Sequence, residues 1–454
     1  MRTMTHSALS ADIQQAAHPL TGNSGDFDPL INRIGSARYV LLGEATHGTH
    51  EFYEARSEIT KRLIREKGFT LVAWEADWPD TLRINRHIQG NLQLQSAEEA
   101  LSGFKRFPIW MWRNTEILNL IGWLKSHNEV VQAESKGSEH APLAGVYGMD
   151  LYSLHASMNS VVDYLEKVNP EAAAEARKRY SCFEDFGQDP QSYGMTAALH
   201  GSLSCEDEVV RQLVDIQQRS AEFLQRAGQM AEDELFYAEQ NALVAKNAEK
   251  YYRAMYRGRP NTWNLRDTHM VDTIDHLMDH FERRGNTPKI VVWAHNSHLG
   301  DARATQMSRR DELNVGQLMR ERHGNEAVLV GFSTHHGTVT AASDWGGVTE
   351  RKRVRPGMER SYEELFHESD AGNFMLVFNE NAELAEELNK SKLERAIGVI
   401  YLPETERYSH YFFADIAQQF DVVLHYDETR ALEPLDRTSE WDAGELPETF
   451  PSGF

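Results

Sequence analysis

Short apolar runs recur along the chain, and each of them ends in polar residues. They lie at 38–42, 70–74, 143–149, 290–294, 327–332, 374–378, 396–402 and 421–426. Continuous runs of this length, rich in β-branched residues, are typical of strands that are buried on both faces, as in a parallel sheet. The pattern therefore predicts an α/β fold with a mainly parallel β-sheet core flanked by helices.

The segment between the first two runs, 50–68, has the pattern of an amphipathic helix. Its apolar residues recur at spacings of three and four, as on one helix face: Phe52, Ala55, Ile59 and Leu63. Gly68 is the expected end of this helix. A strand, a helix and a second strand in this order predict a right-handed unit with two parallel strands.

A long central segment, 151–285, differs from the rest because it has helical patterns of charged and apolar residues and few strand-like runs. We expect it to be a helical insertion that forms part of an active-site cleft. The insertion would interrupt an α/β core whose first part is 25–150 and whose second part is 286–430. The acidic, proline-bearing segment 431–454 is expected to be a loose C-terminal tail.

Composition narrows the classes of partner. The chain of 454 residues has 47 basic and 69 acidic residues, a net charge of -22, which disfavours nucleic acid and anionic membranes as partners. No apolar segment approaches the length of about 18 residues that a membrane span needs, and the N-terminus lacks a signal-peptide core. We therefore expect a cytoplasmic protein in which Cys182 and Cys205 are free thiols.

Polar residues that could carry chemistry follow several of the predicted strands. Ligands of open α/β sheets bind beyond the carboxyl ends of the strands, so these positions are the candidates for a site. They are Glu44, His47, Glu75, Asp150, His295 and His298. Each of them taken alone has a simpler interpretation, as a solvated residue that follows a buried strand. Together they predict a cleft lined by carboxylates and histidines.

The motif GEATH, at 43–47, suits a general base. Gly43 permits a sharp turn, and His47 lies near the start of the predicted helix, whose dipole disfavours the imidazolium form. A neutral imidazole can accept a proton, and Glu44 or Glu75 could hold its tautomer. Arg56 could bind a carboxylate such as Glu75, or could lie on the surface.

The segment WAHNSHLGDAR, at 293–303, brings two further histidines in an H-x-x-H spacing. His295 and His298 could bind one metal ion, or could act as a base and an electrostatic partner. The sequence has no G-x-S-x-G elbow, no P-loop, no dinucleotide fingerprint and no H-E-x-x-H motif. Histidines and carboxylates without an obvious nucleophile indicate that water is the attacking group.

Four segments resemble the erythromycin esterase family: GEATHGTHEFYEARSEITKRLI, LVAWEADW, WNLRDTHM and WAHNSHLGDAR. The resemblance covers about residues 30–430 and implies an α/β core with a helical part over a deep cleft. It further implies hydrolysis of a macrolide lactone by water, without a covalent intermediate and without a required metal or other cofactor. The resemblance makes His47 the base, and its remaining catalytic residues are Glu44, Glu75, Arg56, His295 and His298.

A segment rich in aromatic residues, FKRFPIWMWRN at 104–114, suits the wall of a cleft for a large apolar ligand, although it could equally be core. The predicted substrate-binding residues are Phe107, Trp110, Met111, Trp112 and Arg266. We expect the partner to be a small molecule, a macrolide or another large ester. His295 and His298 would stabilise the oxyanion or protonate the leaving alkoxide.

Two alternatives remain open from the sequence. The same histidines and carboxylates could belong to a metal-dependent hydrolase of another ester or amide. They could also bind a metal or cofactor in a protein that carries no catalytic activity.

Overall fold

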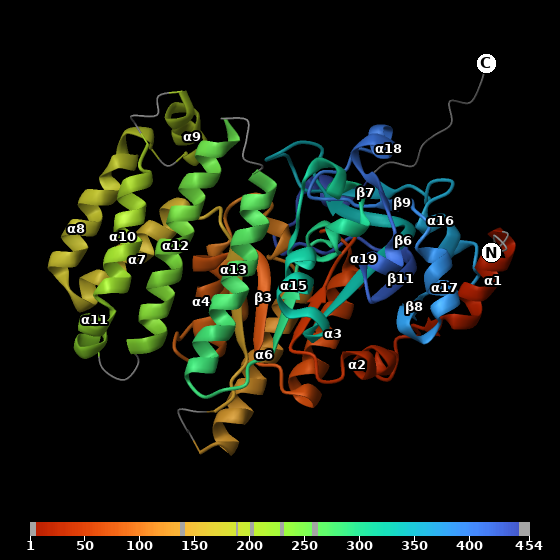
Figure 1. Cartoon of the computed structure of the whole chain (residues 1–454), viewed down its shortest axis with the longest axis horizontal. Helices are drawn as coiled ribbons and strands as arrows, with labels where there is room; N and C mark the ends of the chain where they lie inside the picture. Colours follow the sequence, from red (N-terminus) through yellow and green to blue (C-terminus); the bar gives the residue numbers. More distant parts are fainter. Residues whose placement is uncertain are drawn as a thin grey trace. The chain divides into compact units, whose positions relative to one another are not determined.

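The computed structural model of the chain describes residues 6–136, 141–187, 189–199, 204–227, 231–256 and 262–444. Its residues form two compact units. The first consists of Met1–Val72, Arg86–Gly145 and Pro288–Phe454, and the second of Ala73–Asn85 and Val146–Thr287. Figure 1 shows the sheet strands of the first unit and the long helices, coloured yellow to green, of the second.

The first unit contains a sheet with the strand order β1-β8-β11-β6-β2-β5 and with β7 paired to β6. The neighbours β11, β6, β2 and β5 run parallel, whereas β1, β8 and β7 pair antiparallel. This confirms the predicted mainly parallel core. The strands are β1 (His18–Pro19), β2 (Tyr39–Leu42), β5 (Ile290–Trp293), β6 (Ala327–Ala341), β7 (Glu350–Val354), β8 (Phe374–Val377) and β11 (Val422–Thr429).

Helices of the first unit flank this sheet. They are α1 (His6–Ala16), α2 (Asp28–Ile34), α3 (His50–Lys67), α5 (Ala97–Ala100), α6 (Thr115–Glu134), α14 (Asn296–Leu299), α15 (Val315–His323), α16 (Tyr362–His367), α17 (Ala382–Leu388), α18 (Glu406–Ser409), α19 (Ile416–Gln419) and α20 (Ser439–Ala443). The predicted first helix is α3. It ends as expected at Gly68, which adopts a left-handed conformation with φ 71° that residues with a side chain rarely adopt.

One predicted strand, at 396–402, is wrong. The structure instead forms a two-stranded antiparallel sheet from β9 (Lys392–Arg395) and β10 (Tyr411–Ala414). The apolar run itself makes only isolated bridges, from Ile397 to Thr46 and from Ile400 to Ala342. Its backbone pairs with two different segments, so no continuous ladder forms, and of its residues only Ile397 and Tyr401 are buried.

The second unit is mostly helical. Strands β3 (Leu71–Asp77) and β4 (Gly145–Asp150) are neighbours, and each has its first residues in the first unit. The helices are α4 (Trp78–Ile88), which continues into the first unit from Arg86 on, α7 (Leu154–Val168), α8 (Pro170–Tyr180), α9 (Pro190–Leu199), α10 (Glu206–Gln218), α11 (Ser220–Ala227), α12 (Ala231–Met255) and α13 (Thr262–Arg283). The segment 151–285, predicted to be a helical insertion, falls within this unit.

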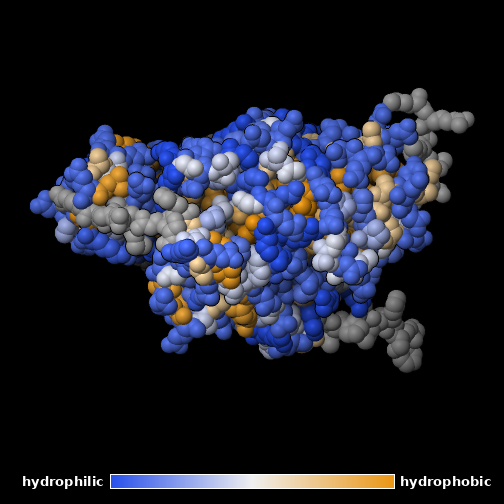
Figure 2. Space-filling model, turned by 90° about the horizontal axis from the view of Figure 1, so that it is seen from below, coloured by the Kyte–Doolittle hydropathy of each residue, from blue (hydrophilic) through white to orange (hydrophobic). Residues whose placement is uncertain are grey.

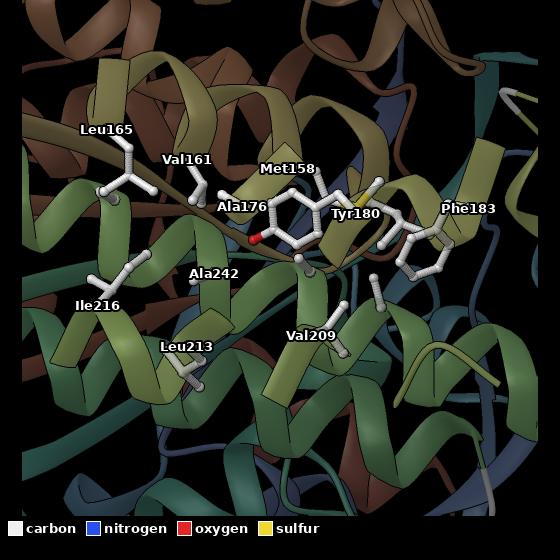
Figure 3. Packing of buried hydrophobic residues seen from close by; sticks show 14 of the residues in the cluster. Met158, Val161, Leu165, Ala176, Tyr180, Phe183, Val209, Leu213, Ile216 and Ala242 are labelled. Carbon is white, nitrogen blue, oxygen red and sulfur yellow. The ribbon is translucent and has the colours of Figure 1, made fainter. Parts of the chain in front are cut away.

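An apolar cluster forms the core of the second unit. Figure 3 shows side chains from α7, α8, α10 and α12 that point toward one another, among them Val161, Ala176, Ile216 and Ala242. All four are less than 2% exposed. Burial of apolar side chains from several amphipathic helices is what holds such a bundle together.

Cys182 and Cys205 form a disulfide within this unit, with their Cα atoms 6.0 Å apart. The expectation of free thiols is therefore wrong. A separation of 23 residues gives no indication of pairing, because the contact depends on how the helices between them turn back. The cysteines therefore give no reason to expect that the protein is located in a reducing compartment.

Two expectations about the surface and the tail can be compared with the structure. Hydrophilic residues predominate on the face drawn in Figure 2, in keeping with the net charge of -22. Over the described ranges, no helix is both long and apolar enough to cross a bilayer. The predicted tail, 431–454, contains α20, and its last ten residues, 445–454, lie outside the described residues.

Candidate active site

Two of the predicted site residues follow adjacent parallel strands. Leu42, the last residue of β2, lies opposite Trp293, the last residue of β5. Glu44 and His295 each come two residues later, so they leave the sheet side by side at its carboxyl end. The ring of His47 completes this group, with its centroid 4.8 Å from that of His295.

Two glycines allow the loop between β2 and α3 to lie tightly against the sheet. A Cβ on Gly43 would be 2.2 Å from Oδ1 of Asn296, and one on Gly48 would be 1.8 Å from the carbonyl oxygen of Thr340 in β6. The carbonyl of Gly48 also accepts hydrogen bonds from the N–H groups of Thr340 (2.9 Å) and Leu432 (2.8 Å). Only glycine fits at these two positions, which fixes the path of the loop.

Glu44 links two predicted site residues through its two carboxylate oxygens. Oε1 lies 2.8 Å from Nδ1 of His47, and Oε2 accepts a 2.5 Å hydrogen bond from Nη2 of Arg56. Glu44 and Arg56 are both fully buried, and His47 is 7% exposed. Charge-assisted hydrogen bonds of this length are strong, and burial shields them from solvent.

This arrangement determines the tautomer of His47. An ionised carboxylate only accepts hydrogen bonds, so Nδ1 of His47 carries the proton that Glu44 binds. In the neutral ring the lone pair is then on Nε2. Within the described part of the chain, Nε2 makes no hydrogen bond. A neutral imidazole with one nitrogen held and the other available has the form that a general base needs.

Arg56 is held by aromatic rings as well as by Glu44. Its guanidinium carbon lies 4.3 Å from the ring centroid of Tyr53 and 4.6 Å from that of Trp293. Contacts of a cation with ring faces are favourable and are stronger where water is excluded. The sequence left the partner of Arg56 open; the structure pairs it with Glu44, and Tyr53 and Trp293 were not foreseen as parts of the site.

His295 has both ring nitrogens occupied. Its Nδ1 accepts from the N–H of Ser297 (3.3 Å) and lies 2.8 Å from the hydroxyl of that residue. The proton is therefore on Nε2, which lies 3.2 Å from the carbonyl oxygen of Ala45 and donates to it. His295 thus ties the start of α14 to the GEATH loop, which is a positioning role.

Asn296 also positions the site, although the sequence analysis missed it. Its backbone N–H donates to the carbonyl of Glu44 (2.8 Å), and its side-chain amide donates to the carbonyl of Phe332 (2.7 Å). The signal available in the sequence was a polar residue between two histidines, which does not distinguish a contact from exposure. His298 is buried (2% exposed).

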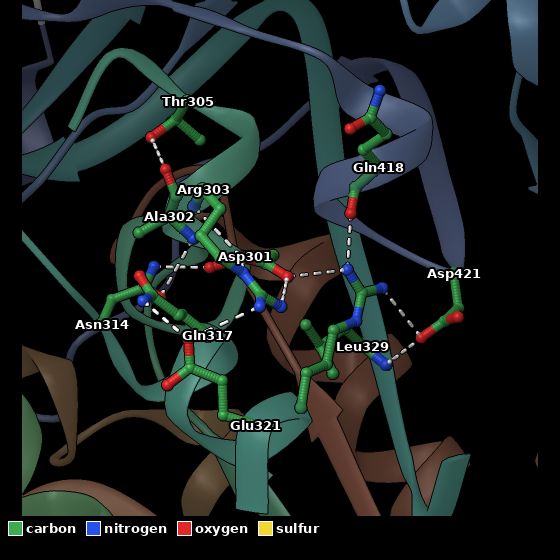
Figure 4. A network of polar contacts seen from close by, with 12 residues as sticks. Asp301, Ala302, Arg303, Thr305, Asn314, Gln317, Glu321, Leu329, Gln418 and Asp421 are labelled. Atoms are coloured by element: carbon green, nitrogen blue, oxygen red, sulfur yellow. Dashed lines mark hydrogen bonds and ion pairs between the residues drawn. The ribbon is translucent and has the colours of Figure 1, made fainter. Parts of the chain in front are cut away.

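A polar network fixes the segment that follows these histidines (Figure 4). Asp301 accepts hydrogen bonds from Arg303, through Nη2 at 2.7 Å, and from Arg320, through Nη1 at 3.3 Å. Burial would raise the pKa of Asp301, but the hydrogen bonds and charge of Arg303 lower it below its usual range. Asn314 binds the carbonyls of Ser297 (2.8 Å) and Gly300. The loop after β5 is therefore rigidly held.

Glu75 and Arg266 lie together in the second unit. Nη2 of Arg266 donates to Oε1 of Glu75 (2.6 Å) and to Oδ2 of Asp150 (2.7 Å), and Nε donates to Oδ1 of Asp150 (3.0 Å). The guanidinium also lies 5.0 Å from the ring centroid of Tyr152. The sequence placed Asp150 only at a strand end, and the structure shows it as the bidentate partner of Arg266.

The aromatic segment at 104–114 is largely inaccessible. Trp110, Met111 and Trp112 are 2%, 5% and 5% exposed. The carbonyl of Met111 accepts from the hydroxyl of Tyr53 (3.0 Å), which joins the segment to α3. Phe107 is half-buried, and its ring contacts that of Trp345, with centroids 5.2 Å apart.

His50, the first residue of α3, belongs to a separate pair. Its Nδ1 lies 2.6 Å from Oε1 of Glu116 in α6. This hydrogen bond raises the pKa of His50 above its ordinary value, against the opposing effect of burial. The pair connects α3 to α6 and leaves His50 without a place in the Glu44 cluster.

The histidines around Glu44 are poorly arranged for a metal. Over the described residues, a set of three possible ligands within 4.8 Å of one another occurs at His335, His367 and Asp427, and not in this cluster. In the cluster itself, both ring nitrogens of His295 form hydrogen bonds with the protein. In this arrangement His295 has no ring nitrogen available for a metal.

The fold defines an α/β protein with a carboxylate–histidine group at the carboxyl end of its parallel strands, and comparison with known proteins identifies its family. The sequence matches the erythromycin esterase family over residues 64–429. The chain therefore belongs to the erythromycin esterase family. The matched range begins after Glu44, His47 and Arg56. The inclusion of these three residues in the candidate site is therefore based on their contacts in the structure and on the sequence motif, and not on the family match.

Individual relatives are distant but cover much of the chain. It is 22% identical to the putative hydrolase YbfO of Bacillus subtilis, over 91% of this chain and 89% of that protein. It is 22% identical to erythromycin esterase type II of Escherichia coli, over 71% and 75% of the two chains. The solved structure of an erythromycin esterase mutant, EreC, superposes with a TM-score of 0.64 at 15% identity, covering 91% and 96%.

Replacing Gly48 by Ala should destabilise the first unit, because the new methyl group would collide with the backbone of Thr340. Overpacking of this kind costs about 1–3 kcal/mol. The matched control is Gly122→Ala in α6, where a Cβ meets nothing within 4 Å and should add up to ~1 kcal/mol of helix stability. Urea unfolding measures both. Equal stability of the two variants would refute the close contact.

The pair of His50 and Glu116 should make stability depend on pH. Because the pKa of His50 is raised in the folded state, the pair stabilises fully below the unfolded pKa of about 6.5 and loses its effect as pH rises through the folded pKa. Glu116→Gln should therefore destabilise on the order of 1 kcal/mol at pH 5.5 and much less at pH 8.5. Urea midpoints at the two pH values test this, with Glu129→Gln, exposed on the same helix, as control. A pH-independent difference would contradict it.

Proposed function

We propose that this protein hydrolyses a carboxylic ester with water activated by His47. The observation that carries the proposal is the Glu44 carboxylate, which holds Nδ1 of His47 at 2.8 Å and leaves the lone pair on Nε2. Nε2 takes a proton from water as the water oxygen attacks the ester carbonyl carbon. The tetrahedral intermediate then breaks its bond to the leaving oxygen, which receives a proton and becomes an alcohol that, in a lactone, stays attached to the opened ring.

Glu44 and Arg56 assist this step in different ways. The carboxylate of Glu44 orients the ring and stabilises the imidazolium that forms when His47 accepts the proton. Arg56 fixes Glu44 through its 2.5 Å hydrogen bond and balances a charge that would otherwise be buried alone. The reacting pair is therefore preorganised before substrate binds.

The other predicted residues receive roles that fit their contacts. His295 positions the GEATH loop through its bond to Ala45. His298 is the proposed donor to the oxyanion or the leaving alkoxide. In the second unit, Arg266 is the proposed polar contact to substrate, and Glu75 holds its guanidinium at 2.6 Å.

For the substrate we propose a macrolide lactone, on the strength of family membership and of the likeness to erythromycin esterase type II. Phe107, half-buried beside Trp345, is the proposed apolar contact for the ring of the ligand. Trp110, Met111 and Trp112 would support that wall from beneath, since they expose little surface themselves. Large rings of this kind are mostly apolar and need such a wall.

Incubation with a panel of macrolides, followed by mass spectrometry, tests the proposal. We expect a product heavier than the substrate by one water, and His47→Gln should lower the rate of its formation about 10²–10⁴-fold. His50→Gln is the matched control, because His50 lies on the same loop-to-helix turn but pairs with Glu116. It should retain the activity.

Thermal unfolding of both variants shows whether they are folded. Hydrolysis by a folded His47→Gln variant at the rate of the unchanged protein would overturn the assignment of the base. Hydrolysis of simple esters with no opening of any macrolide would retain the mechanism and refute the substrate.

A further inference from the structure

A second cluster of histidines lies in the first unit, away from Glu44. It contains His335 on β6, Asp427 on β11 and His367 at the end of α16. Strands β6 and β11 are parallel neighbours, with Thr334 opposite Tyr426. The next residue on each strand is His335 and Asp427, so the fold itself places these two side chains next to each other.

The same register brings a third histidine to this face. His425 precedes Asp427 by two residues, and alternate residues of a strand share a face. Its Nδ1 lies 3.2 Å from the hydroxyl of Ser333, which is its partner on β6. His425 is fully buried, and among the described residues its Nε2 has no hydrogen-bond partner. That nitrogen points toward Oδ1 of Asp427, at 3.6 Å.

The possible ligand atoms of His335, His367 and Asp427 all lie within 4.8 Å of one another. Nδ1 of His367 is 2.7 Å from Oδ1 of Asp427, and the rings of His335 and His367 are stacked with centroids 3.8 Å apart. Tetrahedral zinc with bonds of about 2.05 Å needs ligand atoms roughly 3.3 Å apart. The side chains of His367 and Asp427 are 45% and 27% exposed, so rotation of these two side chains can close the difference without movement of the strands.

We propose that His335, His367 and Asp427 bind a divalent transition-metal ion such as Zn²⁺. Two imidazoles and a carboxylate are the ligand types that such ions prefer, and they leave a fourth position for water. His425 would support the site by orienting the Asp427 carboxylate from its buried side, as second-sphere residues do for metal ligands.

This site is distinct from the proposed catalytic group. Phe332 on β6 and Tyr426 on β11 pack against Phe52 of α3, the helix that carries Arg56, whereas His335 and Asp427 have the opposite parity on these strands and so face the other side of the sheet. A metal here would join β6, β11 and α16, and it would stabilise the fold because the unfolded chain lacks the assembled site. The inference does not depend on the proposed function.

Titration of the metal-free full chain with Co²⁺, followed by visible absorption, tests the site, with displacement by Zn²⁺ as confirmation. We expect one Co²⁺ per chain, and His367→Gln and Asp427→Asn should each weaken binding at least about tenfold. The control is His18→Gln. His18 and Glu380 also form a surface histidine–carboxylate pair at 2.7 Å, and among the described residues no second histidine stacks on His18. This control should bind Co²⁺ as the unchanged chain does.

Thermal unfolding gives an independent measurement on the same proteins. Zn²⁺ should raise the midpoint of the unchanged chain and of His18→Gln, and should leave that of His367→Gln unaltered. His367 is a surface residue, so this variant is expected to fold even if Asp427→Asn does not. Absence of binding by the unchanged chain, or equal binding by a folded His367→Gln variant, would overturn the proposal.

Discussion

The buried carboxylate of Glu44 is the interaction on which the candidate site depends. One of its oxygens holds His47 and the other holds Arg56, and Glu44 and Arg56 are both fully buried. A charge buried in this way is stable only if it is paired, and removing one partner of such a pair typically costs about 3–5 kcal/mol. The same contacts therefore keep the loop folded and hold the imidazole in one tautomer.

The sheet supplies the geometry that Glu44 needs. Strands β2 and β5 end level with each other, so Glu44 and the loop of His295 leave the sheet together. Gly43 and Gly48 let this loop lie against Asn296 and β6 at distances that no other residue permits. The parallel strands, the sharp turn at Gly43 and the loop after β5 thus bring Glu44 and His47 together with His295, although the two segments are 250 residues apart in the sequence.

Features with a local cause could be predicted from the sequence. The runs that became β2, β5 and β6, the helix α3 and its end at Gly68 follow from periodicity and from backbone preferences. Contacts set by tertiary structure could not. The pairing of Arg56 with Glu44, the disulfide and the loss of a strand at 396–402 all depend on which distant segment lies alongside. Burial of Trp110 was likewise undecided, because aromatic residues suit a core and a ligand pocket equally.

The tautomer of His47 tests most directly whether Glu44 holds this histidine in the form of a general base. Nitrogen-15 NMR of the histidine rings distinguishes a protonated from an unprotonated ring nitrogen, and comparison with His47→Gln identifies the signals of this residue. In the neutral ring we predict a proton on Nδ1 of His47, a bare Nε2, and loss of this preference in Glu44→Leu, which removes the acceptor. A neutral ring protonated on Nε2, or a tautomer unaffected by Glu44→Leu, would contradict the proposed role of Glu44.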